Sequence, residues 1–299
     1  LNLYRHIDRE KVQFDFLTNY DAKPIAYEDE ILSMGGHVYR VMYPERKSFT
    51  KAYSSLWAFY TQHPEIQGVH VHANFPYAFP LKVAKKCGIG LRVLHSHNNV
   101  IEVPPHGLSQ KLFHFVRDKV VRSDVKRYPT DYFACSTLAG EWMFPDEHYT
   151  VIKNGIDVDQ FAFHPDIRVR VREQLGLSPS TMVIGFAARL REQKNPIFLL
   201  DIFAEYAKMH PDTMLMVVGV GELRSSMDEH IRQLGIGDKV RFMGQRTDMP
   251  DLYQAMDAYL MPSLFEGLGI VYIEAQCSGL PCLASKDTVP ETAKVTELC

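Results

Sequence analysis

Several features that would define a protein class are absent or scarce in this sequence of 299 residues. No apolar run reaches the roughly 20 residues that a membrane-spanning helix needs. Charge of one sign does not dominate, because 33 basic residues stand against 36 acidic ones and leave a net charge of -3. A nucleic-acid-binding protein is usually strongly basic, so no nucleic-acid partner is expected. Low-complexity stretches and repeats of solenoid length are also missing, which excludes repeat architectures.

Cysteine is scarce as well. The chain has five cysteines, an odd number, and no two of them show the C-x-x-C spacing of zinc or redox sites. The simplest interpretation is that they are reduced thiols in a cytoplasmic protein, because disulfides are rare in that compartment. The five are Cys87, Cys135, Cys277, Cys282 and Cys299.

What the sequence does contain is a regular alternation of short β-rich runs with longer helical patterns. This alternation is typical of parallel sheets built from β-α-β units. With 46% hydrophobic and 23% charged residues, the composition is that of an ordinary globular protein. The strand candidates are VQFDFLT, HVYRVM, VHVHAN, LRVLHS, DYFACS and YTVIKN in the first half, and MVIGFAA, MLMVVGV, KVRFMG, AYLMPS and PCLAS in the second.

The boundary between two domains is expected in the segment that runs from Asn154 to the strand at Met182, because it carries turn residues between two strand sets. We therefore predict an α/β protein with two doubly wound, Rossmann-like domains, residues 1–160 and 161–299, facing across a cleft. Ligands in such sheets bind at the carboxyl ends of the strands, so functional residues should come directly after strands. LNLYRHID at the start and KVTELC at the end suggest that both ends are trimmed.

Basic residues come after the first strand of the second half. AARLREQKN places Arg189 and Lys194 before a helix for which Asn195 is a suitable N-cap and Pro196 a suitable first residue. A helix N-terminus carries partial positive charge and unpaired N–H groups, so this loop is suited to a diphosphate. A solvated basic turn is the alternative, and for this loop taken alone it is the commoner explanation.

Two glycines, Gly219 and Gly221, come after the next strand in VVGVGEL. A dinucleotide fingerprint would have a third glycine where Arg224 stands. Lys239 and Arg241 also occupy the region where a ribose-binding acid belongs, so a nicotinamide site is not expected. The glycines could let a backbone approach a ligand, or they could simply form a tight turn.

SLFEGLGIVYIEAQCSGLP holds two glutamates, Glu266 and Glu274, in an otherwise uncharged stretch. Gly267 and Gly269 allow a phosphate to come close to the start of a helix there. The carboxylates could each accept hydrogen bonds from a different hydroxyl group. The structural alternative is that Glu266 caps the helix and Glu274 is exposed on it, because acids are favourable in a first turn.

Taken together, these segments resemble glycosyltransferase family 4, the retaining nucleotide-sugar transferases of the GT-B fold. The resemblance rests on an E-x7-E motif, an Arg-x4-Lys pair and a Pro-Ser-x2-Glu-Gly turn, which occur in order. VIKNGID and CSTLAGEWMF extend it into the first half, so that it covers nearly the whole chain. RVLHSHN and SKDTVPETAKVTELC look like the bacterial transferases that assemble exopolysaccharide or capsule.

The resemblance implies a role for each matching residue. No cofactor is expected, and no divalent metal either, because the second half, residues 161–299, has no Asp-x-Asp pair suited to magnesium or manganese and offers Arg189, Lys194 and a helix N-terminus instead. Glu274 would bind the ribose hydroxyls of the nucleotide, and Glu266 would hold hydroxyls of the donor sugar. Arg189 and Lys194 would neutralise the diphosphate as it leaves. The remaining donor-binding residues implied are Gly219, Gly221, Gln245, Arg246, Gly267, Leu268, Gly269 and Ile270, with Gln245 and Arg246 near the base. A glycine-rich loop that the family usually carries would precede Leu1.

Histidines alternate in VHVHAN and VLHSHNN, which places His70 and His72 on one face of a strand and His95 and His97 on one face of another. A zinc site is conceivable because imidazole is a good zinc ligand, but no acidic residue lies between Gly68 and Asn99, and no metal is predicted. Hydrogen-bonded core histidines are the alternative, expected for His70 and His95. The family resemblance instead places His97 near the donor sugar as a catalytic residue, with His72 and Asn98 on the acceptor side.

SQKLFHFVRDKVVRSDVKRY, near residues 109–128, reads as a basic amphipathic helix. Such a helix can lie on an anionic membrane surface, or it can pack by its apolar side with a solvated basic face. The lipid-linked acceptors usual for the family favour the membrane slightly. The basic residues are Lys111, Arg117, Lys119, Arg122, Lys126 and Arg127, against Asp118 and Asp124.

The sequence therefore predicts a retaining hexosyltransferase that moves a sugar from a nucleotide sugar, most simply a UDP-sugar, to a saccharide or lipid-linked saccharide. It would act in the cytoplasm or on the inner face of the cytoplasmic membrane. Two other functions remain open. One is an epimerase or hydrolase of nucleotide sugars on the same fold, and the other is a non-catalytic partner subunit that binds the nucleotide.

Overall fold

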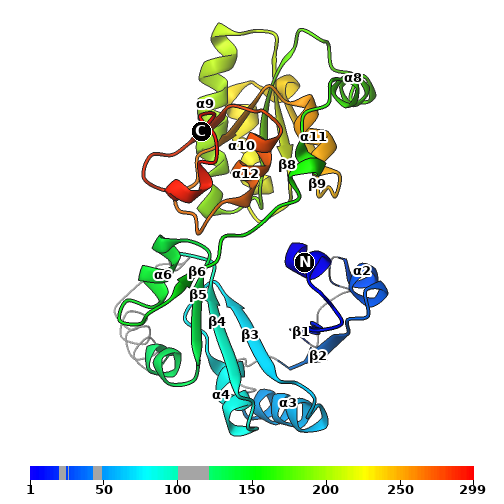
Figure 1. Ribbon diagram of the computed structural model, residues 1–299. Helices are drawn as coiled ribbons and strands as arrows, with labels where there is room; N and C mark the ends of the chain where they lie inside the picture. The colour runs from blue at the N-terminus through cyan, green and yellow to red at the C-terminus, as the bar shows by residue number, and fades with distance from the viewer. Residues whose placement is uncertain (20–24, 26, 43–48, 100–120) are drawn as a thin grey trace, which may run out of the picture. The chain divides into compact units, whose positions relative to one another are not determined.

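The computed structural model describes residues 1–299 except 20–24, 26, 43–48 and 100–120 (Figure 1). The chain divides into two compact units, and the main division falls after Gly155. The sequence places the boundary slightly later, after residue 160. The role of each predicted domain in binding donor or acceptor stays a prediction.

The first unit contains two parallel sheets. A small one joins β1 (Phe16–Asn19) to β2 (Val38–Val41). The larger sheet has the strand order β3-β4-β5-β6, and all of its neighbours run parallel (Figure 1). Its strands are β3 (Gly68–Ala73), β4 (Leu91–Ser96), β5 (Asp131–Ala134) and β6 (Thr150–Val151).

Helices cover the strands of the first unit by burying one face each. On α3 (Phe49–Gln62), the buried residues Ala52, Leu56 and Tyr60 recur every fourth position, which places them on one side of the helix. They join a core that includes Val83 of α4 (Phe79–Lys86). The other helices are α1 (Asn2–His6), α2 (Glu28–Ser33) and α6 (Thr137–Met143).

The second unit is built around one five-stranded parallel sheet. Its strand order is β11-β10-β7-β8-β9, and β7 and β8 are buried along nearly their whole length, as expected for a parallel sheet covered on both faces. The strands are β7 (Met182–Ala187), β8 (Thr213–Val218), β9 (Val240–Gly244), β10 (Ala258–Met261) and β11 (Cys282–Ala284). Every strand candidate taken from the sequence therefore contains a strand.

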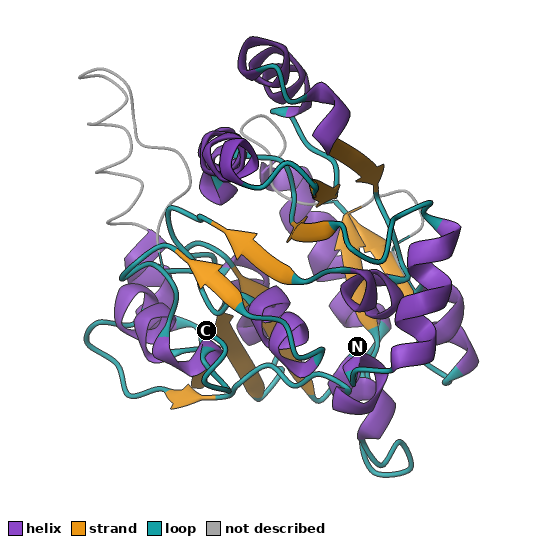
Figure 2. Cartoon of the chain, turned by 90° about the horizontal axis from the view of Figure 1, so that it is seen from above, coloured by secondary structure: helices purple, strands orange, loops and turns teal. Residues whose placement is uncertain are grey.

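The helices of the second unit alternate with these strands along the chain. Figure 2 shows the whole chain from above, with its helices in purple and its strands in orange. In α9, Pro196 is the first helical residue, as predicted. Asn195 is the N-cap residue, also as predicted, but it has a left-handed φ of 51° and its side chain makes no capping hydrogen bond. The helices are α7 (Val158–Phe161), α8 (Pro165–Gln174), α9 (Pro196–Met209), α10 (Arg224–Leu234), α11 (Met249–Ala255) and α12 (Ile270–Cys277), with short 3₁₀ turns η1 (Glu192–Lys194), η2 (Gly237–Lys239) and η3 (Glu291–Ala293).

The strand order of the second sheet reverses between β7 and β10. The chain proceeds outward from β7 to β8 and β9, and then returns to the other side of β7 to form β10 and β11. At such a reversal the connections after the two central strands diverge, which leaves room for a ligand at their carboxyl ends. The connections concerned are 188–195 after β7 and 262–269 after β10.

None of the helices that the structure describes is both long and apolar enough to cross a bilayer.

Candidate functional site

The connections after β7 and β10 are tied together by one residue, Gln193. Its backbone carbonyl accepts a hydrogen bond of 2.8 Å from the Leu264 amide. Its side-chain Nε2 donates a second one of 3.0 Å to the carbonyl of Phe265. Gln193 is buried, and its Oε1 has no hydrogen-bond partner among the residues that the structure describes. The two connections thus form one surface at the reversal point of the sheet.

Lys194 and Glu266 form an ion pair on this surface, which joins the two predicted motifs. Lys194 Nζ lies 2.5 Å from Glu266 Oε1, and the side chains are only 15% and 5% exposed. Ser263 Oγ donates a hydrogen bond of 2.7 Å to the same oxygen. A buried carboxylate costs several kcal/mol unless it is paired and hydrogen-bonded, and these two partners fulfil that need. Within the described parts of the chain, Glu266 Oε2 has no such partner, so one oxygen is held and the other can accept a hydrogen bond.

Glu274 is arranged in a similar way on α12. The hydroxyl of Tyr253 donates a hydrogen bond of 2.9 Å to Glu274 Oε2. Burial raises the pKa of the Glu274 carboxyl, and the Tyr253 hydrogen bond opposes that rise. Its other oxygen, Oε1, has no hydrogen-bond partner among the described residues and can accept a hydrogen bond from a ligand. Each of the two glutamates is therefore held in place through one of its carboxylate oxygens, while the other oxygen remains available.

The structural alternative for the two glutamates is wrong. The helix begins at Ile270 with Gly269 as its N-cap and without any side-chain cap, so Glu266 lies ahead of the helix and does not cap it. Glu274 is only partly exposed. Glycine is required at position 269, because φ is +74° and a Cβ there would lie 2.7 Å from the ring of Tyr272. Leu268 beside it is buried, at 3% exposure.

Arg189 differs from Lys194 although both belong to the same motif. Its side chain is exposed, and no ion pair or side-chain hydrogen bond involves it in the portion of the chain that the structure describes. The alternative of a solvated basic turn thus fits Arg189 in this structure and is wrong for Lys194. A guanidinium without an ion-pair partner among the described residues leaves positive charge available to an anion.

Gly219 and Gly221 support the loop that carries Arg189. A Cβ on Gly219 would lie 2.0 Å from the carbonyl oxygen of Ala188, and one on Gly221 would lie 2.2 Å from that of Leu190. Backbone hydrogen bonds of 3.0 Å link Ala188 to Val218 and Leu190 to Val220 across the same contact. These glycines therefore let two connections of the protein approach each other. Binding of a ligand by their backbone stays a prediction.

Gln245 and Arg246 come after β9 and are exposed. The Arg246 guanidinium forms a two-point contact with the Asp248 carboxylate, with Nε 2.7 Å from Oδ1 and Nη2 close to Oδ2. This contact holds the pKa of Asp248 below its usual range. Arg246 therefore has an acidic partner already, and its predicted place near the base remains a prediction.

The four histidines of the first unit form one cluster on the face of β3 and β4. His70 Nε2 lies 3.2 Å from His95 Nδ1, and His72 Nδ1 lies 2.7 Å from His97 Nε2. The rings of His70 and His72 stack with centroids 4.3 Å apart, and those of His95 and His97 lie tilted by 31° with centroids 4.2 Å apart. Parallel register makes this possible, because His72 and His95 are direct neighbours across the two strands.

The stack keeps its imidazoles neutral. Desolvation, together with repulsion from the neighbouring rings, lowers the pKa of His95 to about 3, and desolvation together with His72 lowers the pKa of His97 to about 4. His70 and His95 are hydrogen-bonded to each other, but the expectation that both are core histidines with satisfied hydrogen bonds is wrong in two respects. His70 is exposed, and His95, although buried, has an Nε2 without a partner among the described residues. Asn98, which follows His97 in the chain, is buried, and its Oδ1 accepts a hydrogen bond from the Asn99 amide.

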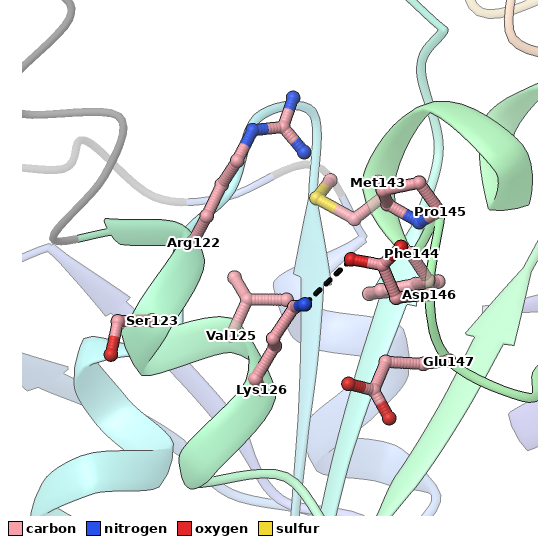
Figure 3. A pocket seen from close by; sticks show the side chains of 9 residues that line it. All are labelled: Arg122, Ser123, Val125, Lys126, Met143, Phe144, Pro145, Asp146 and Glu147. Carbon is pink, nitrogen blue, oxygen red and sulfur yellow. Dashed lines mark hydrogen bonds and ion pairs between the residues drawn. The ribbon is translucent and has the colours of Figure 1, made fainter.

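A pocket of about 360 Å³ lies elsewhere in the first unit (Figure 3). Across it, Lys126 Nζ and Asp146 Oδ2 form an ion pair of 2.6 Å, and this pair lowers the pKa of Asp146. Lys126 belongs to the end of the predicted basic helix, so part of that positive charge is neutralised within the protein. Lys111, Arg117 and Lys119 lie outside the described residues. The pocket is lined by Arg122, Ser123, Val125, Lys126, Met143, Phe144, Pro145, Asp146 and Glu147.

Three residues of the site were not predicted. Gln193 stands directly before Lys194, and Ser263 belongs to the Pro-Ser-x2-Glu-Gly turn, so both had a signal in the quoted motifs. No motif in the sequence indicated Tyr253, because it lies on α11 and reaches Glu274 of α12 only in the folded chain.

Comparison with known sequences is consistent with these motifs. The profile of the family named "Glycosyl transferases group 1" matches residues 168–295. EpsF of Bacillus subtilis (strain 168), a protein named for glycosyltransferase activity, is 33% identical over 300 residues, which cover 97% of this chain and 75% of EpsF. The UDP-Gal:alpha-D-GlcNAc-diphosphoundecaprenol alpha-1,3-galactosyltransferase of Escherichia coli is 34% identical over 146 residues, but this match covers only 46% of this chain and 36% of that enzyme.

Solved structures resemble the whole chain. Anabaena HepE, whose crystal structure contains UDP and glucose, superposes with a TM-score of 0.74 at 20% identity and covers 95% of this chain and 83% of its own. WaaG, a glycosyltransferase involved in lipopolysaccharide biosynthesis, superposes with a TM-score of 0.67 at 16% identity. This superposition covers 92% of this chain and 81% of the WaaG chain. These likenesses confirm the predicted GT-B fold.

Proposed function

The chain belongs to the family of group 1 glycosyl transferases, and from this we propose that it transfers a hexose from a UDP-sugar to a saccharide or lipid-linked saccharide, with retention of the anomeric configuration. We place this reaction in the assembly of exopolysaccharide or capsule. The observation that carries the proposal is the buried pair of Lys194 and Glu266, beside the unpaired Arg189 of the described chain, at the reversal point of the second sheet.

The comparisons support UDP as the nucleotide. HepE was solved with UDP, and the related enzyme of Escherichia coli is named for UDP-Gal. That enzyme is also named for an acceptor on diphosphoundecaprenol, which supports a lipid-linked acceptor here. EpsF, which matches nearly all of this chain, gives no donor in its name.

The free oxygens of the two glutamates suggest how the donor is held. Glu274 Oε1 would accept hydrogen bonds from the ribose, while Tyr253 keeps the carboxylate in place through Oε2. Glu266 Oε2 would accept a hydrogen bond from the sugar, while Lys194 and Ser263 hold Oε1. Carboxylates so fixed bind hydroxyls without losing side-chain freedom at that moment, which favours affinity.

Arg189 and Lys194 would together stabilise the departing diphosphate. A lysine ammonium has three N–H donors, so Lys194 can keep its contact with Glu266 and still donate to a phosphate oxygen. Arg189 is free to form a two-point contact with a second oxygen. At about 4 Å and an effective dielectric of 20, each cation–anion contact is worth on the order of 4 kcal/mol before desolvation. No divalent metal would then be needed for this step.

We assign the transfer itself to a front-face reaction. The bond between the anomeric carbon and the diphosphate oxygen breaks, and the acceptor oxygen forms a bond to the same carbon on the same face. The proton of the acceptor hydroxyl passes to the departing phosphate, so UDP leaves with it. His97, neutral because its pKa is lowered to about 4, would contact the donor sugar as a hydrogen-bonding group and not as a cation.

A panel of UDP- and GDP-sugars, each with and without a lipid-linked acceptor, tests this function. Release of UDP that depends on the acceptor and forms a retained glycosidic bond is the expected result. Turnover without any acceptor would point to a hydrolase or epimerase. Tight UDP binding without turnover in any arm would point to a non-catalytic nucleotide-binding subunit.

We also propose that the basic segment near residues 109–128 brings the enzyme to an anionic membrane. Neutralising Lys111, Arg117, Lys119 and Arg122 should reduce sedimentation with anionic vesicles, and added salt should do the same by screening. Lys126→Ala is a suitable control, because its charge is already paired with Asp146. Unchanged sedimentation of the fourfold variant would favour a solvated basic face.

A further inference from the structure

The histidine cluster of the first unit has the composition of a metal site, although no acidic residue belongs to it. The ligand nitrogens of His70, His72 and His95 all lie within 4.8 Å of one another. Their backbones are fixed by the parallel ladder of β3 and β4, in which His70 pairs with Val93 and His72 pairs with His95. The three side chains therefore share one face of a rigid sheet.

The distances within the cluster suit a transition-metal ion. Zinc–nitrogen bonds are about 2.0–2.1 Å, so two nitrogens of a tetrahedral site lie about 3.3–3.4 Å apart. His70 Nε2 and His95 Nδ1 are already 3.2 Å apart. His72 has to approach by a turn of its ring, and its exposure on β3 leaves room for that turn.

The two ring nitrogens of His95 differ in their surroundings, since Nδ1 faces His70 and Nε2 faces no polar partner that the structure describes. Its side chain is 4% exposed, and its Nε2 has no hydrogen-bond partner within the described parts of the chain. A neutral imidazole carries one N–H, so a proton on Nε2 leaves the lone pair on Nδ1, the nitrogen that faces His70 Nε2, free to bind a metal. Neutral imidazoles bind metals through their free nitrogen, and they prefer zinc, nickel and copper over magnesium or calcium.

We propose that His70, His72 and His95 bind one divalent transition-metal ion, with a fourth position open to water or to His97. Binding would take His72 away from its 2.7 Å hydrogen bond with His97. If His97 contacts the donor sugar, as the proposed function has it, the metal acts as an inhibitor and not as a cofactor. Only this consequence for catalysis rests on the proposed function; the site itself does not.

The test is a titration of the tag-free protein with zinc chloride in competition with a chromogenic chelator, without any nucleotide sugar. We expect one zinc ion per chain, and no binding of magnesium. His70→Gln and His72→Gln should each weaken zinc binding by at least about tenfold, since even a residue that merely supports a metal ligand changes affinity by 10- to 100-fold. His37→Gln is the matched control, because His37 is an exposed histidine of the same unit, next to Asp15 and outside the cluster. It should bind zinc as the wild type does.

Two outcomes would overturn the site. One is the absence of stoichiometric zinc binding by the wild type, and the other is equal affinity in the His70→Gln variant, the His72→Gln variant and the His37→Gln control. Circular dichroism should show that the variants keep their fold. In a separate arm, zinc should inhibit sugar transfer by the wild type and inhibit the His70→Gln variant less. An enzyme that binds zinc at the cluster and stays fully active would retain the site and refute the link to His97.

Discussion

The two units of the chain place polar side chains on neighbouring parallel strands or directly after them, but they stabilise these side chains by different means. The second unit pairs opposite charges, since Lys194 and Glu266 share a buried contact of 2.5 Å. The first unit gathers four like groups, His70, His72, His95 and His97, and keeps them neutral. The same sheet geometry can thus present charged groups or neutral groups with free lone pairs, depending on which residues stand on the strands and directly after them.

This difference decides what a mutation leaves behind. Removing one member of a buried ion pair leaves the other charge buried without a partner, which lowers the stability of the fold by about 3–5 kcal/mol. Removing one imidazole leaves only a neutral polar group without a partner, which lowers the stability of the fold by about 1–3 kcal/mol. The contrast can be tested with single variants, with pH and with metal removal, and the ion pair should give the strongest response.

Lys194→Ala should lower turnover at least a hundredfold, because removal of one group that stabilises developing charge typically costs a factor of about 10²–10³. It should also destabilise the second unit by leaving the Glu266 carboxylate buried and unpaired. Initial rates and urea unfolding measure the two effects. The double variant Lys194→Ala/Glu266→Gln separates them, since it should regain stability and stay inactive. Lys208→Ala, which breaks an exposed pair with Glu205, should change neither quantity much.

Glu274→Ala should weaken UDP binding by about ten- to more than a hundredfold, since a lost hydrogen bond to a charged group costs roughly 1.5–3 kcal/mol. Calorimetry with UDP measures this. Glu266→Gln should bind UDP as the wild type does but turn over the sugar donor poorly. The UDP affinity of Tyr253→Phe should lie between those of the wild type and Glu274→Ala, because this variant keeps the carboxylate and removes only the hydrogen bond that holds it. Equal UDP affinity in the wild type and Glu274→Ala would rule out the ribose assignment.

Gly269→Ala should lower the free energy of unfolding by about 1–3 kcal/mol through backbone strain, with a further cost from the contact of its Cβ with Tyr272. Gly279→Ala is the matched control for strain alone, because its φ of +75° is nearly the same and no atom lies within 4 Å of a Cβ there. Denaturant unfolding of both variants gives the difference. If the two variants are equally stable, the Tyr272 contact contributes nothing.

The two regions should respond to pH in opposite directions. The folded-state pKa of His95 is about 3, below the unfolded value near 6.5, so stability should fall as the pH drops from about 6.5 toward 3. The pKa of Glu274 is raised by burial, so its carboxyl favours the folded state at low pH and this contribution is lost as the pH rises through the raised pKa. Both effects are tested by measuring the free energy of unfolding of the metal-free protein at several pH values. Glu274→Gln should gain stability relative to the wild type at about pH 8 and not at about pH 4.

The smallest effect is expected from metal removal. Excess EDTA should leave sugar transfer intact, because Arg189 and Lys194 are available to stabilise the diphosphate. Activity assays with EDTA, and with magnesium or manganese added back, measure this. Loss of activity with EDTA that manganese restores would contradict the metal-free reaction.

Much of this arrangement can be derived from the sequence, and the part that cannot has a physical reason. Strands were predictable because β-rich runs ended at turn residues, and parallel strands bring the residues after their carboxyl ends to one edge of the sheet. Arg189, Lys194 and Glu266 were therefore placed correctly after β7 and β10. The pairing of Lys194 with Glu266 was not predictable, since these residues are 72 positions apart in the chain and meet only through the strand order. The histidine stack likewise depends on the register of β3 against β4, which local sequence does not encode.

The double link made by Gln193 has a consequence for enzyme engineering. Since its backbone and its side chain both hold the connection after β10, residues 188–195 and 262–269 behave as one cassette. Exchanging only the second segment with that of a relative, in order to change the sugar accepted, would break contacts that position Lys194. Chimeras that transplant both segments together should therefore retain activity more often than chimeras that transplant either one.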